Sequence, residues 1–320
     1  MTEPLTGFID ALQSAGLSVK NDLSGAMLTT YRVGGPIAHC VSLTSRDDIN
    51  TLAGIISSYF VGQLNDRNVV TIGKGSNLLV DDQGFDGCVF RLEGELAEFN
   101  GSSNRIDEHI RVTVGGGVPL PTFARQCVPE AIAGLEFYVG IPGSVGGAVA
   151  MNAGGHGKQT SDVLVSCNVL NLSSGIIERF SNESCHFSYR HSRFRPTDII
   201  YSVQFEGKEG NPARIKRDVD SIVQWRREHQ PGGRNVGSVF QNPPDISAGE
   251  LIDKCELKGF RIGGAYVSEK HANFIQSDEG ATAEDIYAVI EHIRSVVFES
   301  TGYKLDTEVR HIGKYDNESR

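Results

Sequence analysis

Apolar residues recur every three or four positions in four segments of the chain, a spacing that predicts amphipathic helices. These segments are residues 1–16, 45–60, 211–230 and 282–301. Ser45 with Asp48, and Thr282 with Asp285, have the spacing of a capping box, which sets the start of the second and the fourth helix. Each helix is therefore expected to bury one stripe of side chains and expose the rest.

Between these helices, short runs of β-branched or alternating apolar residues predict strands. They are residues 29–43 around a Gly-Gly-Pro turn, 68–73, 109–117, a hairpin at 162–180 that turns at Ser-Ser-Gly, and 199–207. Residues 73–87 are interpreted as a loop with a short apolar insert, and residues 120–128 as a short helix. Near residue 207 the pattern changes from mostly strands to a mixture of helices and strands, and we place a domain boundary there.

Length and charge narrow the class of protein. A chain of 320 residues suggests two domains, and a formal net charge of −10 disfavours a nucleic-acid or anionic-membrane surface. No apolar run reaches the ~20 residues that a membrane span needs, and the start has no basic-then-apolar signal. The six cysteines show no C-x-x-C pair, so reduced thiols and no metal site are expected. We expect a cytoplasmic protein with no nucleic-acid or membrane partner.

Glycine is concentrated in GIPGSVGGAVAMNAGGHG, residues 140–157. Because glycine costs roughly 0.5–1 kcal/mol relative to alanine in a regular element, such a cluster suggests a backbone that closely approaches a ligand. The sequence G-x-G-x-x-G before a helix and the sequence G-x-x-x-x-G-K-[ST] are both absent, which disfavours Rossmann and P-loop sites. A second loop, GKGSN at residues 73–77, follows a predicted strand. Two such loops favour a pyrophosphate held by backbone amides, with plain tight turns as the alternative.

Seven motifs occur in an order and spacing that carry a resemblance to a known family. They are TTYRVGGPI, GKGSNLLV, GIPGSVGGAVAMNAGG, SYRHSRF, GSVFQNP, AYVSEKHANFI and LDTEVRHIG. Each motif alone is weak, whereas seven in order are specific. Over residues 28–313 the chain closely resembles the UDP-N-acetylenolpyruvoylglucosamine reductases, bacterial enzymes that make a peptidoglycan precursor.

The resemblance implies an α+β fold, with an FAD-binding domain of the p-cresol methylhydroxylase type and a C-terminal α+β substrate-binding domain. The implied divisions are a helical segment at 1–27, the FAD-binding domain at 28–207 with subdomains near 28–92 and 93–207, the C-terminal domain at 208–314, and a tail at 315–320. It also implies non-covalent FAD, which NADPH reduces and which then reduces UDP-N-acetylglucosamine enolpyruvate to UDP-N-acetylmuramate. A monomer is expected.

Three residues match catalytic positions of the family. Arg190 would face the enolate that forms when hydride reaches the alkene, since developing negative charge needs a cation or an acid. Glu308 would lie beside the enolate carboxyl group, with a pKa raised by burial. Ser238 would protonate the second carbon in a preorganised site. Without the resemblance, the default interpretations are a surface arginine, an exposed edge-strand carboxylate and a turn serine.

Further site residues follow from the same motif matches. The expected cofactor-binding set is Gly73, Lys74, Gly75, Ser76, Asn77, Leu78, Gly140, Ile141, Pro142, Ser144, Val145, Gly146, Gly147, Asn152, Ala153, Gly154 and Gly157. Amides of residues 144–147 are expected to face the pyrophosphate, and residues 152–157 to run beside the flavin. The expected substrate-binding set is Asn242, His271, Arg310 and Arg226, with a solvated helix face as the alternative for Arg226.

Two other functions stay open from the residues alone. Another enzyme of the same flavin fold could oxidise alcohols or sugars, with FAD tethered to His156 in the glycine segment. A non-catalytic module that binds a nucleotide sugar is the second alternative. The joint presence of Arg190, Ser238 and Glu308 argues against it, because a binder needs neither a proton donor nor an enolate partner.

Overall fold

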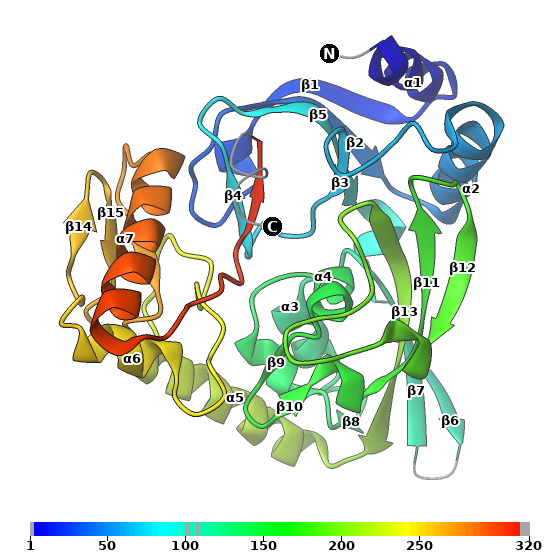
Figure 1. Ribbon diagram of the computed structural model, residues 1–320. Helices are drawn as coiled ribbons and strands as arrows, with labels where there is room; N and C mark the ends of the chain where they lie inside the picture. The colour runs from blue at the N-terminus through cyan, green and yellow to red at the C-terminus, as the bar shows by residue number, and fades with distance from the viewer. Residues whose placement is uncertain (1–2, 100, 102, 107–108, 314–320) are drawn as a thin grey trace. The chain divides into compact units, whose positions relative to one another are not determined.

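The computed structural model describes residues 3–99, 101, 103–106 and 109–313 (Figure 1). The expected tail at 315–320 and the first two residues of the chain lie outside the described residues. The described residues fall into two compact units, whose bounds are given along the whole chain. Unit 1 is Met1–Asn21, His39–Lys74 and Asp86–Gln224, and unit 2 is Asp22–Ala38, Gly75–Phe85 and Trp225–Arg320. The sequence-based domain limits divide the chain into consecutive segments, one for each expected function, and they stay a prediction.

A four-stranded sheet, most of which belongs to unit 1, lies next to two helices (Figure 1). Its order is β1 (Ser18–Ser24), β2 (Pro36–Leu43), β5 (Phe85–Leu92) and β3 (Val69–Thr71). The helices are α1 (Glu3–Ser14) and α2 (Arg46–Ile55), and a π-helical turn at Ile56–Phe60 continues α2. Phe8 of α1 is fully buried against Phe60 and Phe90. The predicted helices and the capping box of Ser45 and Asp48 are confirmed.

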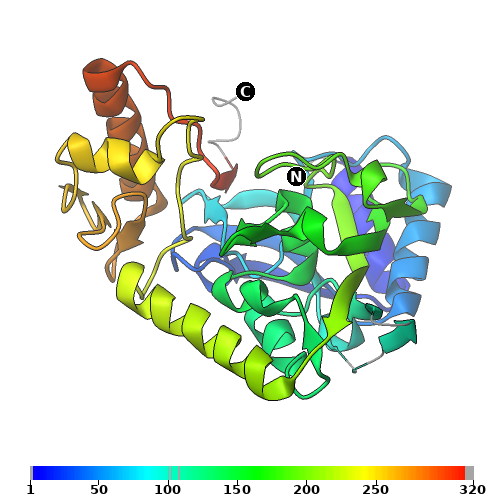
Figure 2. The ribbon, with the colours of Figure 1, turned by 90° about the horizontal axis from the view of Figure 1, so that it is seen from below.

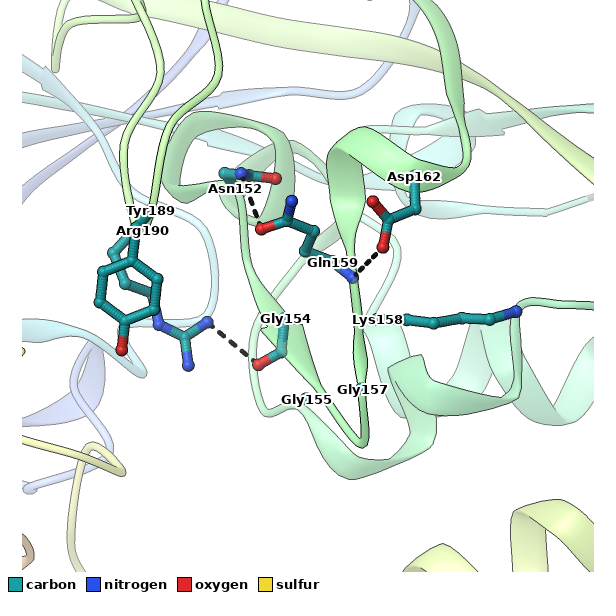
Figure 3. Close-up of a pocket in the computed structure, with 9 residues that line it drawn as sticks. All are labelled: Asn152, Gly154, Gly155, Gly157, Lys158, Gln159, Asp162, Tyr189 and Arg190. Carbon is teal, nitrogen blue, oxygen red and sulfur yellow. Dashed lines mark hydrogen bonds between the residues drawn. The ribbon is translucent and has the colours of Figure 1, made fainter. Parts of the chain in front are cut away.

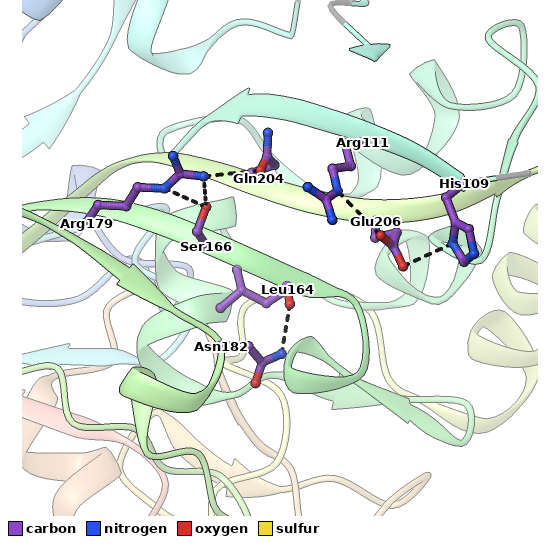
Figure 4. Close-up of polar contacts among 8 residues, drawn as sticks. All are labelled: His109, Arg111, Leu164, Ser166, Arg179, Asn182, Gln204 and Glu206. Carbon is purple, nitrogen blue, oxygen red and sulfur yellow. Dashed lines mark hydrogen bonds and ion pairs between the residues drawn. The ribbon is translucent and has the colours of Figure 1, made fainter. Parts of the chain in front are cut away.

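A six-stranded antiparallel sheet forms the rest of unit 1. Along the sheet lie β12 (Ile177–Ser181), β11 (Leu164–Asn171), β13 (Asp198–Glu209), β7 (His109–Gly115) and β6 (Ser103–Ile106), while β8 (Ile132–Ala133) pairs with β13. The predicted hairpin and the strands at 109–117 and 199–207 are confirmed. Polar side chains cover one face, where Arg179 donates to Ser166 and Glu206 pairs with Arg111 and His109 (Figure 4).

The opposite, apolar face of this sheet packs against α3 (Leu120–Gln126) and α4 (Val145–Met151). Val145 and Val149 of α4 are fully buried in the same core as Val203 and Phe205 of β13. This packing fixes the position of the glycine segment, because α4 is its central part.

Unit 2 has a separate hydrophobic core. Its elements are β4 (Leu78–Val80), α6 (Ala248–Lys254), β14 (Arg261–Ile262), β15 (Ala265–Val267), β16 (Ile275–Ser277), α7 (Ala283–Thr301) and β17 (Arg310–Ile312). β14, β15 and β16 form an antiparallel sheet, and β17 pairs in parallel with β4. The predicted capping box of Thr282 and Asp285 starts α7 and is confirmed.

Helix α5 (Pro212–His229) is continuous, and the division between the units falls inside it, after Gln224 (Figure 2). Its predicted stripe is confirmed, since Ile215 and Val219 are buried. No helix of the described part of the chain combines the length and apolar content needed to cross a bilayer.

Three local predictions are wrong. Residues 29–33 form turns and not a strand. The segment at 73–87 is more than a loop, because residues 78–80 form β4, whose partner β17 is remote in sequence. The centre of the glycine segment is helical at α4, although glycine disfavours helices, because burial of Val145 and Val149 offsets that cost.

Candidate active site

A cavity of about 300 Å³ lies in unit 1 beside the second half of the glycine segment (Figure 3). It is lined by Asn152, Gly154, Gly155, Gly157, Lys158, Gln159, Asp162, Tyr189 and Arg190. Two short strands, β9 (Gly154–Gly155) and β10 (Lys158–Gln159), form an antiparallel hairpin on one side. Its glycines have no side chain to fill the cavity, so a ligand can approach the backbone closely. Four predicted site residues therefore line one cavity: Asn152, Gly154, Gly157 and Arg190.

Arg190 extends into this cavity from a tight turn. Backbone hydrogen bonds of 3.1 and 3.2 Å join Ser188 and His191 in both directions, which leaves Tyr189 and Arg190 at the tip. Arg190 has a φ of 55°, a left-handed conformation that costs a non-glycine residue roughly 1–2 kcal/mol. Its Nη1 donates to the carbonyl oxygen of Gly154 at 3.0 Å (Figure 3). The guanidinium is thus held against the glycine hairpin.

Asn152 ends helix α4 in a left-handed conformation with a φ of 43°. Its side chain is buried, and its Oδ1 accepts a hydrogen bond from the Ser161 amide at 3.0 Å. Its Nδ2 donates to the Ser188 carbonyl at 2.9 Å and to Gln159 Oε1 at 3.3 Å. The carboxamide therefore joins three separate positions of the chain around the cavity.

The loop that begins GKGSN approaches the start of α4. A Cβ at Gly73 would collide with Ser144 Oγ, which accepts from the Gly147 amide at 3.3 Å as the N-cap of α4. Gly73 and Gly147 are both exposed. Next to Gly73, burial and the nearby Arg91 lower the pKa of Lys74. The two glycine loops that were expected to share a ligand therefore lie against each other.

The expected contact between the amides of residues 144–147 and a pyrophosphate stays a prediction, but two of these amides already have acceptors in the protein. The amides of Val145 and Gly146 donate to the carbonyls of Val118 and Gly116 at 2.9 and 2.7 Å, and so do not face a ligand. In contrast, the amides of Gly73 and Lys74 have no acceptor within the described part of the chain. A pyrophosphate therefore fits the amides of the GKGSN loop better than those of the first turn of α4.

In unit 2, backbone pairing brings the segments of Ser238 and Glu308 together. The Glu308 amide donates to the carbonyl of Val239, the residue after Ser238, at 2.8 Å. Asn77 Nδ2 donates to the Glu308 carbonyl at 2.7 Å, and the Arg310 amide donates to the Asn77 carbonyl at 3.1 Å. The sequence suggested that Glu308 lies on the last strand. In the structure Glu308 instead precedes that strand, β17, which begins at Arg310. The expected rise in its pKa stays a prediction.

The four expected substrate-binding residues have different surroundings. Asn242 is exposed, and its Oδ1 accepts from the Ala248 amide at 2.9 Å, which supports the start of α6. Burial lowers the pKa values of His271, Arg310 and Arg226. Partial burial makes Arg226 more than a solvated helix residue, although its substrate contact stays a prediction.

Five residues that line the cavity were not among the predicted site residues: Gly155, Lys158, Gln159, Asp162 and Tyr189. Gln159 and Asp162 form a local cap, in which Asp162 Oδ2 accepts from the Gln159 amide at 2.9 Å. Tyr189 is 52% exposed, and the Cζ atom of Arg190 lies 5.6 Å from the centre of the Tyr189 ring. Its place directly before Arg190 in SYRHSRF was the available sequence signal.

Two family models match the chain in succession. A model described as FAD binding domain matches residues 36–181. A model described as UDP-N-acetylenolpyruvoylglucosamine reductase, C-terminal domain, matches residues 229–312. The first covers the GKGSN loop, the glycine segment and β11, and the second covers Ser238 and Glu308.

Relatives match over nearly the whole chain. The UDP-N-acetylenolpyruvoylglucosamine reductase of Heliobacterium modesticaldum is 41% identical over 290 residues, which are 89% of this chain and 88% of that protein. The same-named protein of Bacillus subtilis is 39% identical over 292 residues, 89% of this chain and 91% of that protein.

Solved structures agree with these matches. UDP-N-acetylenolpyruvylglucosamine reductase from Thermus caldophilus has a TM-score of 0.78 at 30% identity, covering 93% of this chain and all of that one. Physcomitrella patens BBE-like 1 has a TM-score of 0.53 at 11% identity, covering 91% of this chain and 88% of that one, which shows a shared fold alone. The expected α+β fold with an FAD-binding domain of the p-cresol methylhydroxylase type is confirmed. The chain belongs to the family of UDP-N-acetylenolpyruvoylglucosamine reductases, FAD-containing oxidoreductases.

Proposed function

We propose that this protein reduces UDP-N-acetylglucosamine enolpyruvate to UDP-N-acetylmuramate with NADPH, a step in making the peptidoglycan precursor. The observation that supports this most directly is the Arg190 guanidinium, held beside the glycine hairpin in the cavity. Reduction of an enolpyruvyl ether develops negative charge next to its carboxylate, and a fixed cation lowers the energy of that charge. We further propose that the protein acts in the cytoplasm as a monomer.

The residues present fit a non-covalent FAD. Gly155 and Gly157 add no side chain to the cavity wall, and the amides of Gly73 and Lys74 can take phosphate oxygens. When bound, FAD supplies hydride transfer between NADPH and the substrate. His156, the candidate for a covalent tether in the rival oxidase, is exposed in the glycine segment.

We assign three separate tasks to side chains of this chain. Arg190 stabilises the enolate, and Ser238 donates its hydroxyl proton to the second alkene carbon. The π bond of the alkene is thus replaced by two C–H bonds, one formed by hydride and one by this proton. Glu308 binds the carboxyl side of the enolate. Because a serine hydroxyl is a weak acid, this proton transfer depends on a substrate carbanion that is strongly basic and well placed.

The test begins with the colour of the purified protein. We expect a flavin absorption spectrum, release of the flavin by acid precipitation, and NADPH oxidation that depends on the enolpyruvyl substrate. Flavin that stays with the acid precipitate would favour the tethered oxidase. A colourless protein that binds no added FAD would overturn the proposal.

A further inference from the structure

The turn that carries Arg190 is attached to the end of helix α4 at two points. On one side, Asn152 Nδ2 donates to the Ser188 carbonyl at 2.9 Å. On the other, Ser192 Oγ donates to the Ala150 carbonyl at 2.7 Å, and this hydroxyl is buried. Both attachments lie two residues from Arg190 in sequence, so they fix both ends of the turn.

The Asn152 attachment closes a ring of contacts. From Asn152 the ring passes through the Ser188 carbonyl to Arg190, whose Nη1 donates to the Gly154 carbonyl at 3.0 Å. Gly154 is two residues beyond Asn152, so the ring returns to its start. Moving the Asn152 carboxamide therefore moves both the base of the Arg190 turn and the carbonyl that orients the guanidinium.

The geometry points to Asn152 as the positioning residue for Arg190, in place of the direct cofactor contact that the sequence suggested. Three observations support this. The side chain is 1% exposed, its oxygen accepts from the Ser161 amide, and its nitrogen donates to two acceptors. An amide nitrogen carries two protons, so both donors are used inside the protein. The inference rests on the proposed function only in its kinetic test, because that test measures reduction of the enolpyruvyl substrate.

Two substitutions separate the side chain from the backbone conformation. Asn152→Asp keeps the shape and the acceptor for Ser161, but places a carboxylate oxygen against the Ser188 carbonyl. Asn152→Gly removes the carboxamide and tolerates the φ of 43°, because glycine populates that region readily. If the aspartate variant fails to fold, the glycine variant still carries the test.

Hydrogen–deuterium exchange of the FAD-loaded protein reads the turn without any assumption about the reaction. In wild type the His191 amide donates to the Ser188 carbonyl, so we expect slow exchange there. Both Asn152 variants should speed exchange across residues 188–194. Asn182→Asp is the matched control, because Asn182 Nδ2 also donates to backbone carbonyls, those of Leu164 (Figure 4) and Ser161. Among the described residues, no hydrogen bond joins the Asn182 side chain to residues 188–192. Unchanged exchange at 188–194 in both Asn152 variants would overturn the inference.

The kinetic arm uses a double-mutant cycle with Arg190→Lys. Each Asn152 variant should slow substrate reduction about 10- to 100-fold, as expected when a reacting group shifts by ~1 Å. Flavin affinity and flavin reduction by NADPH should change less than about twofold, and the Asn152 effect should largely disappear in the Arg190→Lys background. Weaker flavin binding in the Asn152 variants would indicate a direct cofactor contact and contradict the positioning role. So would an Asn152 substitution that slows substrate reduction as much in the Arg190→Lys protein as in wild type. If the wild-type protein reduces no enolpyruvyl substrate, the proposed function fails while the exchange result still decides the positioning role.

Discussion

The side-chain amide of Asn77 donates to the backbone carbonyl of Glu308 at 2.7 Å, across 231 positions of sequence. The Arg310 amide donates back to the Asn77 carbonyl at 3.1 Å, and β4 and β17 continue this pairing in parallel. A residue expected to bind the cofactor is thus bonded to a residue with a proposed catalytic role. The loop at 73–77 and the segment at 305–310 are coupled through this pair.

We expect Asn77→Asp to destabilise the protein and to slow substrate reduction. The carboxylate would lose the donated hydrogen bond and would face the Glu308 carbonyl, a loss of about 1–3 kcal/mol for a partly buried group. Urea unfolding gives the stability, and stopped-flow reoxidation of the reduced flavin gives the rate. Asn68→Asp is the control, because the sequence neighbours Gln63 and Asn65 are the hydrogen-bond partners of the Asn68 side chain, which thus makes a local bond of the same kind. Equal effects in the two variants would contradict a special role for Asn77.

Ser238→Ala should separate the two half-reactions. Flavin reduction by NADPH should stay nearly unchanged, whereas reoxidation by the enolpyruvyl substrate should slow about 10²- to 10⁴-fold, the range for loss of a general acid. Rapid-mixing absorbance measurements follow both steps. Ser45→Ala should cost about 1 kcal/mol of stability as a lost N-cap, without changing either step. If Ser238→Ala slows both half-reactions equally, Ser238 has a structural role.

Gly73→Ala should weaken FAD binding. Its Cβ would collide with Ser144 Oγ, so the backbone at Gly73 and Lys74 would have to shift. Loss of one hydrogen bond from these amides to phosphate costs about 1 kcal/mol, which corresponds to roughly a fivefold higher Kd. Fluorescence titration of the apoprotein with FAD measures this. Gly54→Ala is the control, because a Cβ there meets nothing within 4 Å inside α2. That control should gain about 0.5–1 kcal/mol of stability and bind FAD as wild type does. Unchanged affinity in Gly73→Ala would exclude this loop from the cofactor site.

Acid pH should destabilise the protein in part through His271. Burial lowers the pKa of its imidazole below the ordinary 6.5, so the unfolded chain takes up a proton at higher pH than the folded chain does. The contribution to stability is therefore complete above about pH 6.5, and is lost as pH falls through the lower folded pKa.

His271→Gln should accordingly reduce the difference between urea midpoints measured at about pH 7.5 and pH 5.5. An unchanged difference in His271→Gln would contradict the linkage.

Much of the fold could be predicted because it depends on local signals. Helices α2 and α7 begin at capping boxes that two residues each define, and their buried faces follow from spacing alone. The hairpin β11–β12 turns where Ser-Ser-Gly is flanked by apolar runs. The family, and with it FAD, followed from seven motifs in order, which no single motif would have supported.

Remote partners decided what the sequence left open. β4 is three residues long and carries no periodic signal, so it forms only because β17 supplies its hydrogen bonds. Helix α4 forms in a glycine-rich segment because Val145 and Val149 are buried against the six-stranded sheet. The sequence by itself determined which residues are expected in the site, because the seven motifs in their order identify the family and these residues lie within the motifs. Only the tertiary structure decided that Asn152 bonds to the Arg190 turn and that the amides of Val145 and Gly146 are already used, because a hydrogen-bond partner distant in the chain leaves no local pattern.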